Sequence, residues 1–381
     1  MTESHGFCDE KFAAVREQFE KNFDERGDVG GSFAATIEGE YVIDLWAGHR
    51  NADKTLPWEE DTIVNVYSTT KTMTFLTALI LADRGELDLS APIASYWPEF
   101  AANGKADILV SQILCHATGL AAFDPPMGEE IYDHSQAAAN LAAQKPLWEP
   151  GSQSGYHAVT QGILIGEVVR RITGQSLGTW FRGNVTDEVG ADFHIGLSPD
   201  HFDRTADMLP DPAPAASPLA GGDQQPDMNS IPVKVFTSMQ LPDNAVNSPG
   251  WRQAELPAAN GHGNARAVVR AQTAMANDGT AFGKTLLSKA GVDRASEEQI
   301  TSTDLVLGFP ITFCMGYARG NPMLPLCPNP DAIWWAGAGG SSIGVDKGNR
   351  LCYSYVMNQM KATLVGDERG SGLSASLYAS L

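Results

Sequence analysis

The sequence is poor in cysteine and in basic residues, and it has no long uninterrupted apolar run. Of its 381 residues, five are cysteines, with no C-x-x-C pair among them: Cys8, Cys115, Cys314, Cys327 and Cys352. An odd, scattered set of cysteines fits neither a disulfide framework nor a zinc site, so we expect no bound metal and a reducing compartment. No apolar stretch approaches the roughly 20 residues that a membrane-spanning helix needs.

The scarcity of basic residues also limits the partners of the chain. Lys and Arg number 26 against 46 Asp and Glu, which leaves a formal net charge of −20. Such a chain repels phosphate backbones and anionic lipid surfaces, so we predict that it binds neither nucleic acid nor membranes. Its first 23 residues carry acidic side chains where a signal peptide has a basic segment and an apolar core, so we expect a cytoplasmic protein.

Periodic patterns predict regular elements in the first 86 residues. Residues 9–26 are predicted to form a helix, because apolar residues recur at helical spacing: Phe12, Val15, Phe19 and Phe23. Two strand-like runs flank Glu38-Gly39-Glu40 and predict a β-hairpin. Residues 68–83 are predicted to form a helix whose apolar residues give it one buried face: Met73, Leu76, Leu79 and Ile80. Gly85 follows where a left-handed helix cap belongs.

The residue pattern after position 86 predicts helices first and strands later. Residues 87–184 look mostly helical, and residues 205–250 are so rich in Pro, Gly and Ala that we predict a long loop. Strand-like runs then return at 311–320, 332–346 and 350–360. We therefore predict an α+β fold with two domains. An antiparallel sheet flanked by terminal helices comes from residues 1–86 and 255–381, and residues 87–254 form an inserted, mainly helical domain.

Ser68 and Lys71 form the chain's one Ser-x-x-Lys pattern, at the start of a predicted helix. A serine nucleophile needs a base within hydrogen-bond distance, and residues three apart on a helix lie on the same face. Free N–H groups at a helix start can also stabilise a developing oxyanion. Ser-x-x-Lys is the nucleophile motif of β-lactamases and penicillin-binding proteins. The alternative is a serine that only caps the helix and a solvated lysine.

A second serine competes for the role of nucleophile. Gly340-Ser341-Ser342-Ile343-Gly344 matches the G-x-S-x-G elbow of α/β-hydrolases. That fold places its histidine after the serine in the chain, and no histidine follows Ser342. We therefore interpret these glycines as part of a tight turn between strands.

Four motifs in order support the first serine. They are Ser68–Lys71, "LCHATGL" at 114–120, "EPGSQSGYHAVTQGILIGEVVRRITG" at 149–174 and "WWAGAGGSSIG" at 334–344. Together they resemble the serine β-lactamase and DD-peptidase superfamily. The resemblance is closest to its esterase branch, the family VIII carboxylesterases similar to class C β-lactamases. It covers nearly the whole chain and implies a β-lactamase/transpeptidase-like fold without a cofactor.

The resemblance also implies roles for the matching residues. Ser68 would be the nucleophile, and Tyr156 matches the family's catalytic tyrosine. Tyr156 would act as a phenolate or share a proton with Lys71, whose ammonium would stabilise the phenolate. The backbone N–H groups of Ser68 and Ala338 would form the oxyanion hole. Which of Lys71 and Tyr156 is the resting base stays open, because coupled groups share their titration.

Two departures from the lactamase pattern indicate the substrate. Trp335-Ala336-Gly337 stands where β-lactamases carry Lys-Thr-Gly, and Ala158 stands where they carry an asparagine. An indole cannot pair with a carboxylate, so the change favours neutral, apolar esters over lactams. Gly337 would let the strand approach the ligand closely.

Three further residues lie in or near these motifs. We name Phe123 and His157 as further substrate-binding candidates beside Trp335 and Gly337. His157 could equally orient Tyr156 or pack in the core. We interpret His116, in "LCHATGL", as a structural residue.

The sequence thus predicts a serine carboxylesterase that cleaves short- to medium-chain acyl esters through an acyl-enzyme on Ser68. Its partner would be a small-molecule ester, and self-association into a homo-oligomer stays open. The alternatives are a weak β-lactamase, a D-amino-acid peptidase, an acyltransferase, or a non-catalytic scaffold that kept the fold.

Overall fold

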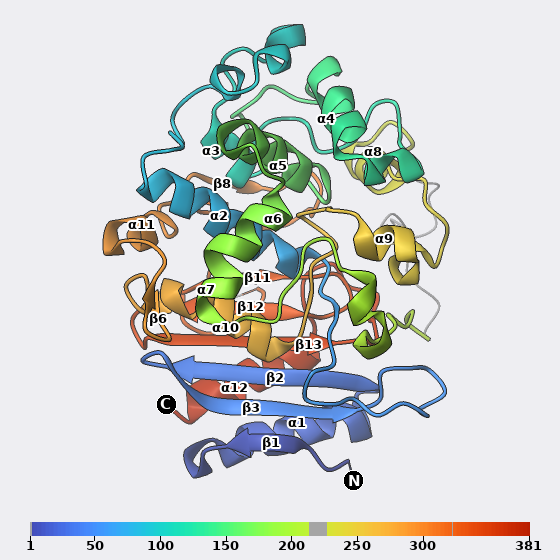
Figure 1. The fold of residues 1–381 in the computed structure, drawn as a ribbon, viewed down its shortest axis with the longest axis vertical. Helices are drawn as coiled ribbons and strands as arrows, with labels where there is room; N and C mark the ends of the chain where they lie inside the picture. The colour runs from blue at the N-terminus through green and yellow to red at the C-terminus, as the bar shows by residue number, and fades with distance from the viewer. Residues whose placement is uncertain (1, 213–226, 322) are drawn as a thin grey trace.

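The computed structural model describes residues 2–212, 227–321 and 323–381. These residues form one large antiparallel sheet and many helices packed around it (Figure 1). Within this described part the sheet has nine strands. In spatial order they are β1 (His5–Cys8), β3 (Glu40–Gly48), β2 (Gly30–Ile37), β13 (Leu351–Met357), β12 (Ser342–Asp346), β11 (Ile333–Ala336), β10 (Ala318–Arg319), β9 (Pro310–Phe313) and β8 (Ile300–Thr303). Both ends of the chain build this sheet, which confirms the predicted α+β arrangement.

The predicted hairpin joins β2 and β3. Ile37 pairs with Glu40, so Glu38 and Gly39 form the two-residue turn. Both turn residues have positive φ, 52° and 88°, which is the backbone of a type I′ turn that matches the twist of the strands. On its other edge β2 pairs with β13, where Ala34 lies opposite Ser354. The N-terminal and C-terminal strands therefore meet in the middle of the sheet.

Helices cover both faces of the sheet. The long ones are α1 (Ala13–Glu25), α10 (Ala265–Ala276) and α12 (Glu368–Ala379). Thr36 of β2 shares a hydrogen bond with Thr273 of α10, whereas Tyr353 of β13 packs against Tyr378 of α12. Successive strand residues point to opposite faces, and Thr36 lies opposite Cys352, the neighbour of Tyr353. Helix α10 thus covers one face, and α12 with its neighbour α1 covers the other.

The remaining helices lie mostly between the two sheet-forming parts of the chain. They are α3 (Val110–Leu114), α4 (His134–Ala143), α5 (Thr160–Thr173), α6 (Leu177–Phe181), α7 (Asp187–Val189), α8 (Ile231–Thr237), α9 (Pro249–Gln253) and α11 (Lys289–Arg294). Two short ribbons complete the chain: β4 (Val64–Asn65) with β5 (His262–Gly263), and β6 (Thr280–Ala281) with β7 (Lys284–Thr285). Among the described residues, every helix is too short or too polar to traverse a lipid bilayer.

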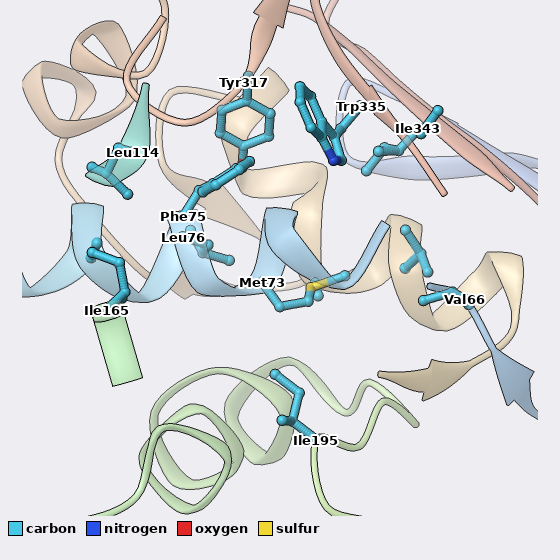
Figure 2. Packing of buried hydrophobic residues seen from close by; sticks show 14 of the residues in the cluster. Val66, Met73, Phe75, Leu76, Leu114, Ile165, Ile195, Tyr317, Trp335 and Ile343 are labelled. Atoms are coloured by element: carbon cyan, nitrogen blue, oxygen red, sulfur yellow. The ribbon is translucent and has the colours of Figure 1, made fainter. Parts of the chain in front are cut away.

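Helix α2 (Lys71–Asp83) runs through the centre of the molecule, between the sheet and the other helices (Figures 1 and 2). Trp335 and Ile343 lie on its sheet side in Figure 2, and Ile165 and Ile195 lie on its other sides. The helix and its Gly85 cap, with φ of 74°, match the prediction. The four residues predicted to form a buried face are buried, and so is every other residue from Lys71 to Leu81. A helix enclosed on all sides has no solvated stripe.

Two other parts of the chain differ from the sequence prediction. Strand β1 pairs with β3 at the sheet edge, although its four residues are mostly exposed and carry no apolar alternation. Part of the predicted 205–250 loop is helical, because Ser230 and Ser248 each precede a proline at a helix start, in α8 and α9. Residues 213–226 of that loop lie outside the described residues.

Candidate active site

Ser68 lies where a sharp turn leads the chain into α2. Strand β4 ends at Asn65, and Tyr67 has φ of 44° and ψ of −129°, outside the regions that non-glycine residues favour. Ser68 then begins a 3₁₀ turn, Ser68–Thr70, that continues into α2. Backbone strain of this kind persists only where the surrounding structure fixes it. The packed turn therefore holds the Ser68 hydroxyl in one position, with 9% of the residue exposed.

Lys71 is fully buried beside Ser68. Its Nζ lies 3.1 Å from Ser68 Oγ, and it donates to the carbonyl oxygens of Ala158 at 2.7 Å and Ala258 at 3.0 Å. Burial holds the pKa of the Lys71 ammonium well below its ordinary value. A neutral amine has two hydrogens and one lone pair. The two carbonyls take the hydrogens, which leaves the lone pair for the Ser68 proton.

Tyr156 completes the group around Ser68. Its hydroxyl donates to Ser68 Oγ at 2.5 Å, and Lys71 Nζ lies 4.8 Å from the centre of its ring. Burial raises the pKa of the Tyr156 phenol, and the nearby Asp304 carboxylate raises it further, although the Ser68 contact opposes both. These directions bear on which of Lys71 and Tyr156 is the resting base, a question that the sequence left open. They favour a resting site with a protonated phenol and a neutral amine.

The end of strand β11 passes close to Ser68. A Cβ atom on Gly337 would lie 2.3 Å from the Val66 carbonyl oxygen and 3.2 Å from the Ser68 nitrogen, so only glycine fits there. The next residue is Ala338. In the described part of the chain, the N–H groups of Ser68 and Ala338 have no protein acceptor. Both are therefore available to a substrate oxygen.

Trp335 forms one wall of a small cavity at the site. Its ring lies 5.8 Å from that of Tyr156 and stacks on His116 at 5.7 Å, and its buried Nε1 has no acceptor among the residues that the structure describes. The cavity is narrow, and its lining is apolar apart from the Tyr156 hydroxyl and the indoles: Tyr156, Leu307, Ile311, Trp334, Trp335, Ala336, Leu364 and Val365.

Phe123 and His157 do not line this cavity. Both ring nitrogens of His157 have protein partners, Thr118 Oγ1 at 2.7 Å and the Gly155 carbonyl oxygen at 2.6 Å. Burial lowers the pKa of His157 to about 3, so its ring is neutral. Phe123 is buried. These contacts fit the alternative of a packing role for His157, and they give neither residue a surface for substrate.

His116 and Ser341 support the residues of the site. His116 Nδ1 accepts the backbone N–H of His157 at 3.1 Å. Ser341 Oγ donates to the Val66 carbonyl oxygen at 2.8 Å and lies 2.9 Å from Thr69 Oγ1. The neighbouring Ser342 lies in strand β12, with no histidine beside it in the described hydrogen bonds. The glycine-rich turn thus braces the start of α2.

Sequence reasoning missed two kinds of contributor. The carbonyl oxygens of Ala158 and Ala258 orient Lys71, and no side-chain pattern can reveal a backbone acceptor. Asp304 accepts the backbone N–H of Tyr156 at 3.0 Å, although the two residues are 148 positions apart in the sequence. Its sequence signal is a single aspartate after a strand-like run, which is common in turns.

Comparisons with known proteins agree with this geometry. The beta-lactamase family model matches residues 17–373. Esterase/beta-lactamase LipL from Mycobacterium tuberculosis is 32% identical over 372 residues, which cover 94% of this chain and 84% of LipL. The crystal structure of a family VIII carboxylesterase has 38% identity and a TM-score of 0.92, with 100% of both chains covered. A penicillin-binding protein homologue from Caulobacter crescentus has 37% identity, the same TM-score and the same coverage.

These matches extend over nearly the whole chain, as the resemblance of its four motifs predicted. The α+β architecture agrees with them at the level of the fold. The chain belongs to the beta-lactamase family.

Proposed function

We propose that this chain is a serine carboxylesterase that cleaves neutral esters of short- to medium-chain acyl groups. The observation that carries the proposal is the position of Ser68 Oγ, 3.1 Å from Lys71 Nζ and 2.5 Å from the Tyr156 hydroxyl. A serine nucleophile needs a base within such reach. The relatives support the same reaction, since one is an esterase/beta-lactamase and another is a family VIII carboxylesterase.

In the acylation step, Ser68 Oγ forms a bond to the ester carbonyl carbon while its proton passes to the neutral amine of Lys71. The backbone N–H groups of Ser68 and Ala338 stabilise the oxyanion that develops. The intermediate then collapses and the bond to the alcohol oxygen breaks. Tyr156 donates its proton to that oxygen, and the alcohol leaves. The acyl-enzyme thus holds an ammonium on Lys71 and a phenolate on Tyr156, whose opposite charges stabilise each other.

In the deacylation step, a water molecule gives a proton to the Tyr156 phenolate and attacks the acyl carbon. When this second intermediate collapses, the bond to Ser68 Oγ breaks and Lys71 returns its proton to that oxygen. The carboxylic acid leaves, and each group regains its resting proton. Lys71 therefore serves as the base for Ser68, and Tyr156 serves as the acid for the leaving alcohol.

The cavity beside Tyr156 supports an apolar alcohol portion for the ester. Tyr156 donates to the leaving oxygen and also lines the cavity, so the group attached to that oxygen would enter it. The lining carries no charged side chain. A carboxylate there would lose its hydration without gaining a cation. Neutral esters are therefore the proposed substrates, and carboxylate-bearing lactams fit poorly.

The kcat/KM for ethyl butyrate should rise with pH and level off before about pH 10, near the ordinary pKa of lysine. Only the neutral amine of Lys71 can accept the Ser68 proton, and burial lowers the pKa of that group. The rising limb therefore reports the deprotonation of Lys71 in the free enzyme. Recording the rate with a pH-stat between pH 5 and pH 11 gives the profile. A limb centred at the ordinary lysine value would contradict a neutral resting amine.

The choice between ester and lactam can be tested directly. We expect p-nitrophenyl butyrate to have a kcat/KM about 10³-fold or more above that of a chromogenic cephalosporin, since charged pairing with a substrate carboxylate is absent from the cavity lining. Both reactions are followed by absorbance on one enzyme preparation. Cephalosporin turnover at an equal or higher kcat/KM would replace the esterase proposal with a β-lactamase.

A further inference from the structure

Asp304 connects the sheet to the loop that carries Tyr156. It follows strand β8 in the turn that leads to β9, and it is 1% exposed. Its Oδ1 accepts the backbone N–H of Tyr156 at 3.0 Å. The same oxygen accepts the N–H groups of Val306 and Leu307, each at 2.9 Å. One carboxylate oxygen therefore fixes its own turn and the catalytic tyrosine together.

A second set of contacts holds the same two segments together. Ser154 Oγ lies 3.0 Å from Ser302 Oγ, and the N–H of Ser154 donates to that hydroxyl at 3.3 Å. The N–H of Leu305 donates to the Ser154 carbonyl oxygen at 2.9 Å. The loop before Tyr156 thus lies along the end of β8 at several points. Asp304 is the charged member of this junction.

A buried carboxylate at this point needs an explanation beyond the turn itself. Within the described residues, Asp304 has no ion-pair partner, and its Oδ2 is buried without a hydrogen bond. Burying a carboxylate without a cation is costly, and the hydrogen bond from the Tyr156 N–H gives this one a role beyond its own turn. The negative charge also acts on the site, because it adds to the burial that raises the pKa of Tyr156.

We propose that Asp304 is a positioning residue that fixes Tyr156 against Ser68, so that the phenol can donate its proton to the leaving alcohol. This inference rests on the proposed ester hydrolysis. Asp304 touches neither Ser68 nor the reacting atoms, and it acts through the backbone of Tyr156. Through Leu307 the same turn also forms part of the cavity wall.

The test compares two esters that differ in their need for an acid. Ethoxide is a strong base and must be protonated as it leaves, whereas p-nitrophenolate leaves without a proton. In Asp304→Ala, displacement of Tyr156 should lower kcat/KM for ethyl butyrate by about 10²-fold and leave p-nitrophenyl butyrate within a few-fold. Asp304→Asn keeps an acceptor oxygen and should retain most of the ethyl butyrate rate. An equal loss for both esters would overturn the inference.

A double-mutant cycle separates positioning from general damage. In a Tyr156→Phe background, Asp304→Ala should change the ethyl butyrate rate by less than about twofold, because the group it positions is already gone. The matched control is Asp346→Ala, which removes an equally buried aspartate that accepts the backbone N–H of Asn349 on the α12 side of the sheet. Asp346→Ala should change kcat/KM for ethyl butyrate and for p-nitrophenyl butyrate by the same factor. Full additivity of Asp304→Ala with Tyr156→Phe would overturn the inference.

Failure to fold and failure of the proposed function have separate readouts. If Asp304→Ala does not fold, Asp304→Asn still decides, since retention of the ethyl butyrate rate supports the role of the acceptor oxygen and a loss shared by both esters opposes it. If the wild type cleaves neither ester, the proposed function is lost. The crystal structure of the Asp304 variant then decides the inference. A Tyr156 hydroxyl still bonded to Ser68 Oγ would overturn it, and a displaced one would support it.

Discussion

Replacing Ser68 with alanine should lower kcat for p-nitrophenyl butyrate by about 10⁴- to 10⁶-fold, the range seen when a serine hydrolase loses its nucleophile. The hydroxyl is the group placed within reach of both Lys71 Nζ and the Tyr156 hydroxyl. Its removal leaves the oxyanion donors without an attacking atom. The measurement is release of p-nitrophenolate by wild type and variant at equal concentration, with the melting temperature of each as a check on folding.

The matched control for this substitution is Ser342→Ala. Ser342 is a buried serine of the G-x-S-x-G pattern in strand β12, and no hydrogen bond among the described residues joins its hydroxyl to a lysine or a histidine. We expect this variant to keep nearly the full rate. If Ser68→Ala retained activity and Ser342→Ala lost it, the nucleophile would have been misassigned and the mechanism above would be wrong.

Tyr156→Phe should affect the two esters unequally. Because the phenol is the proposed acid, kcat/KM for ethyl butyrate should fall by about 10²- to 10⁴-fold, the usual contribution of a general acid. For p-nitrophenyl butyrate, whose leaving group needs no proton, the fall should be about tenfold or less. The parameter kcat/KM is the correct one, because it reports the acylation step and excludes deacylation.

An equal loss for both esters would mean that Tyr156 takes the Ser68 proton instead. That result would favour the phenolate that the family resemblance implies, and it would require Lys71 to be charged at rest. Among the described residues, the hydroxyl of Tyr156 has one hydrogen-bond partner, Ser68 Oγ. Its removal should therefore change the stability of the fold little, which the melting temperature can verify.

Much of the fold could be predicted because its local signals are strong. Gly39 supplies the residue type that the second position of the hairpin turn favours, and the apolar run after Ser68 ends at a glycine cap. Strand β1 could not be predicted, because its position depends on pairing with β3 and its side chains are exposed. Nor could the complete burial of α2 be predicted. It depends on other elements that enclose Thr72, Thr74 and Thr77 together with the apolar residues.

In the candidate site, too, some features could be predicted from the sequence and others could not. Motifs identified Ser68, Lys71 and Tyr156, and the structure places Lys71 Nζ and the Tyr156 hydroxyl each within hydrogen-bond distance of Ser68 Oγ. The protonation states were not predictable. They depend on burial and on two backbone carbonyls that orient Lys71, neither of which a spacing can reveal. Asp304 was missed for the same reason, since its effect is exerted through a backbone N–H far along the chain.

The walls of the cavity beside Tyr156 indicate how such an enzyme can acquire new substrates during evolution. Leu307 belongs to the turn after β8, and Leu364 and Val365 belong to the segment between β13 and α12. The nucleophile comes from the 3₁₀ turn Ser68–Thr70 and the base from α2, in a different part of the chain. Connecting segments tolerate exchange far better than a buried helix does. Selection can therefore change the alcohols that are accepted, one wall residue at a time, while the chemistry stays the same.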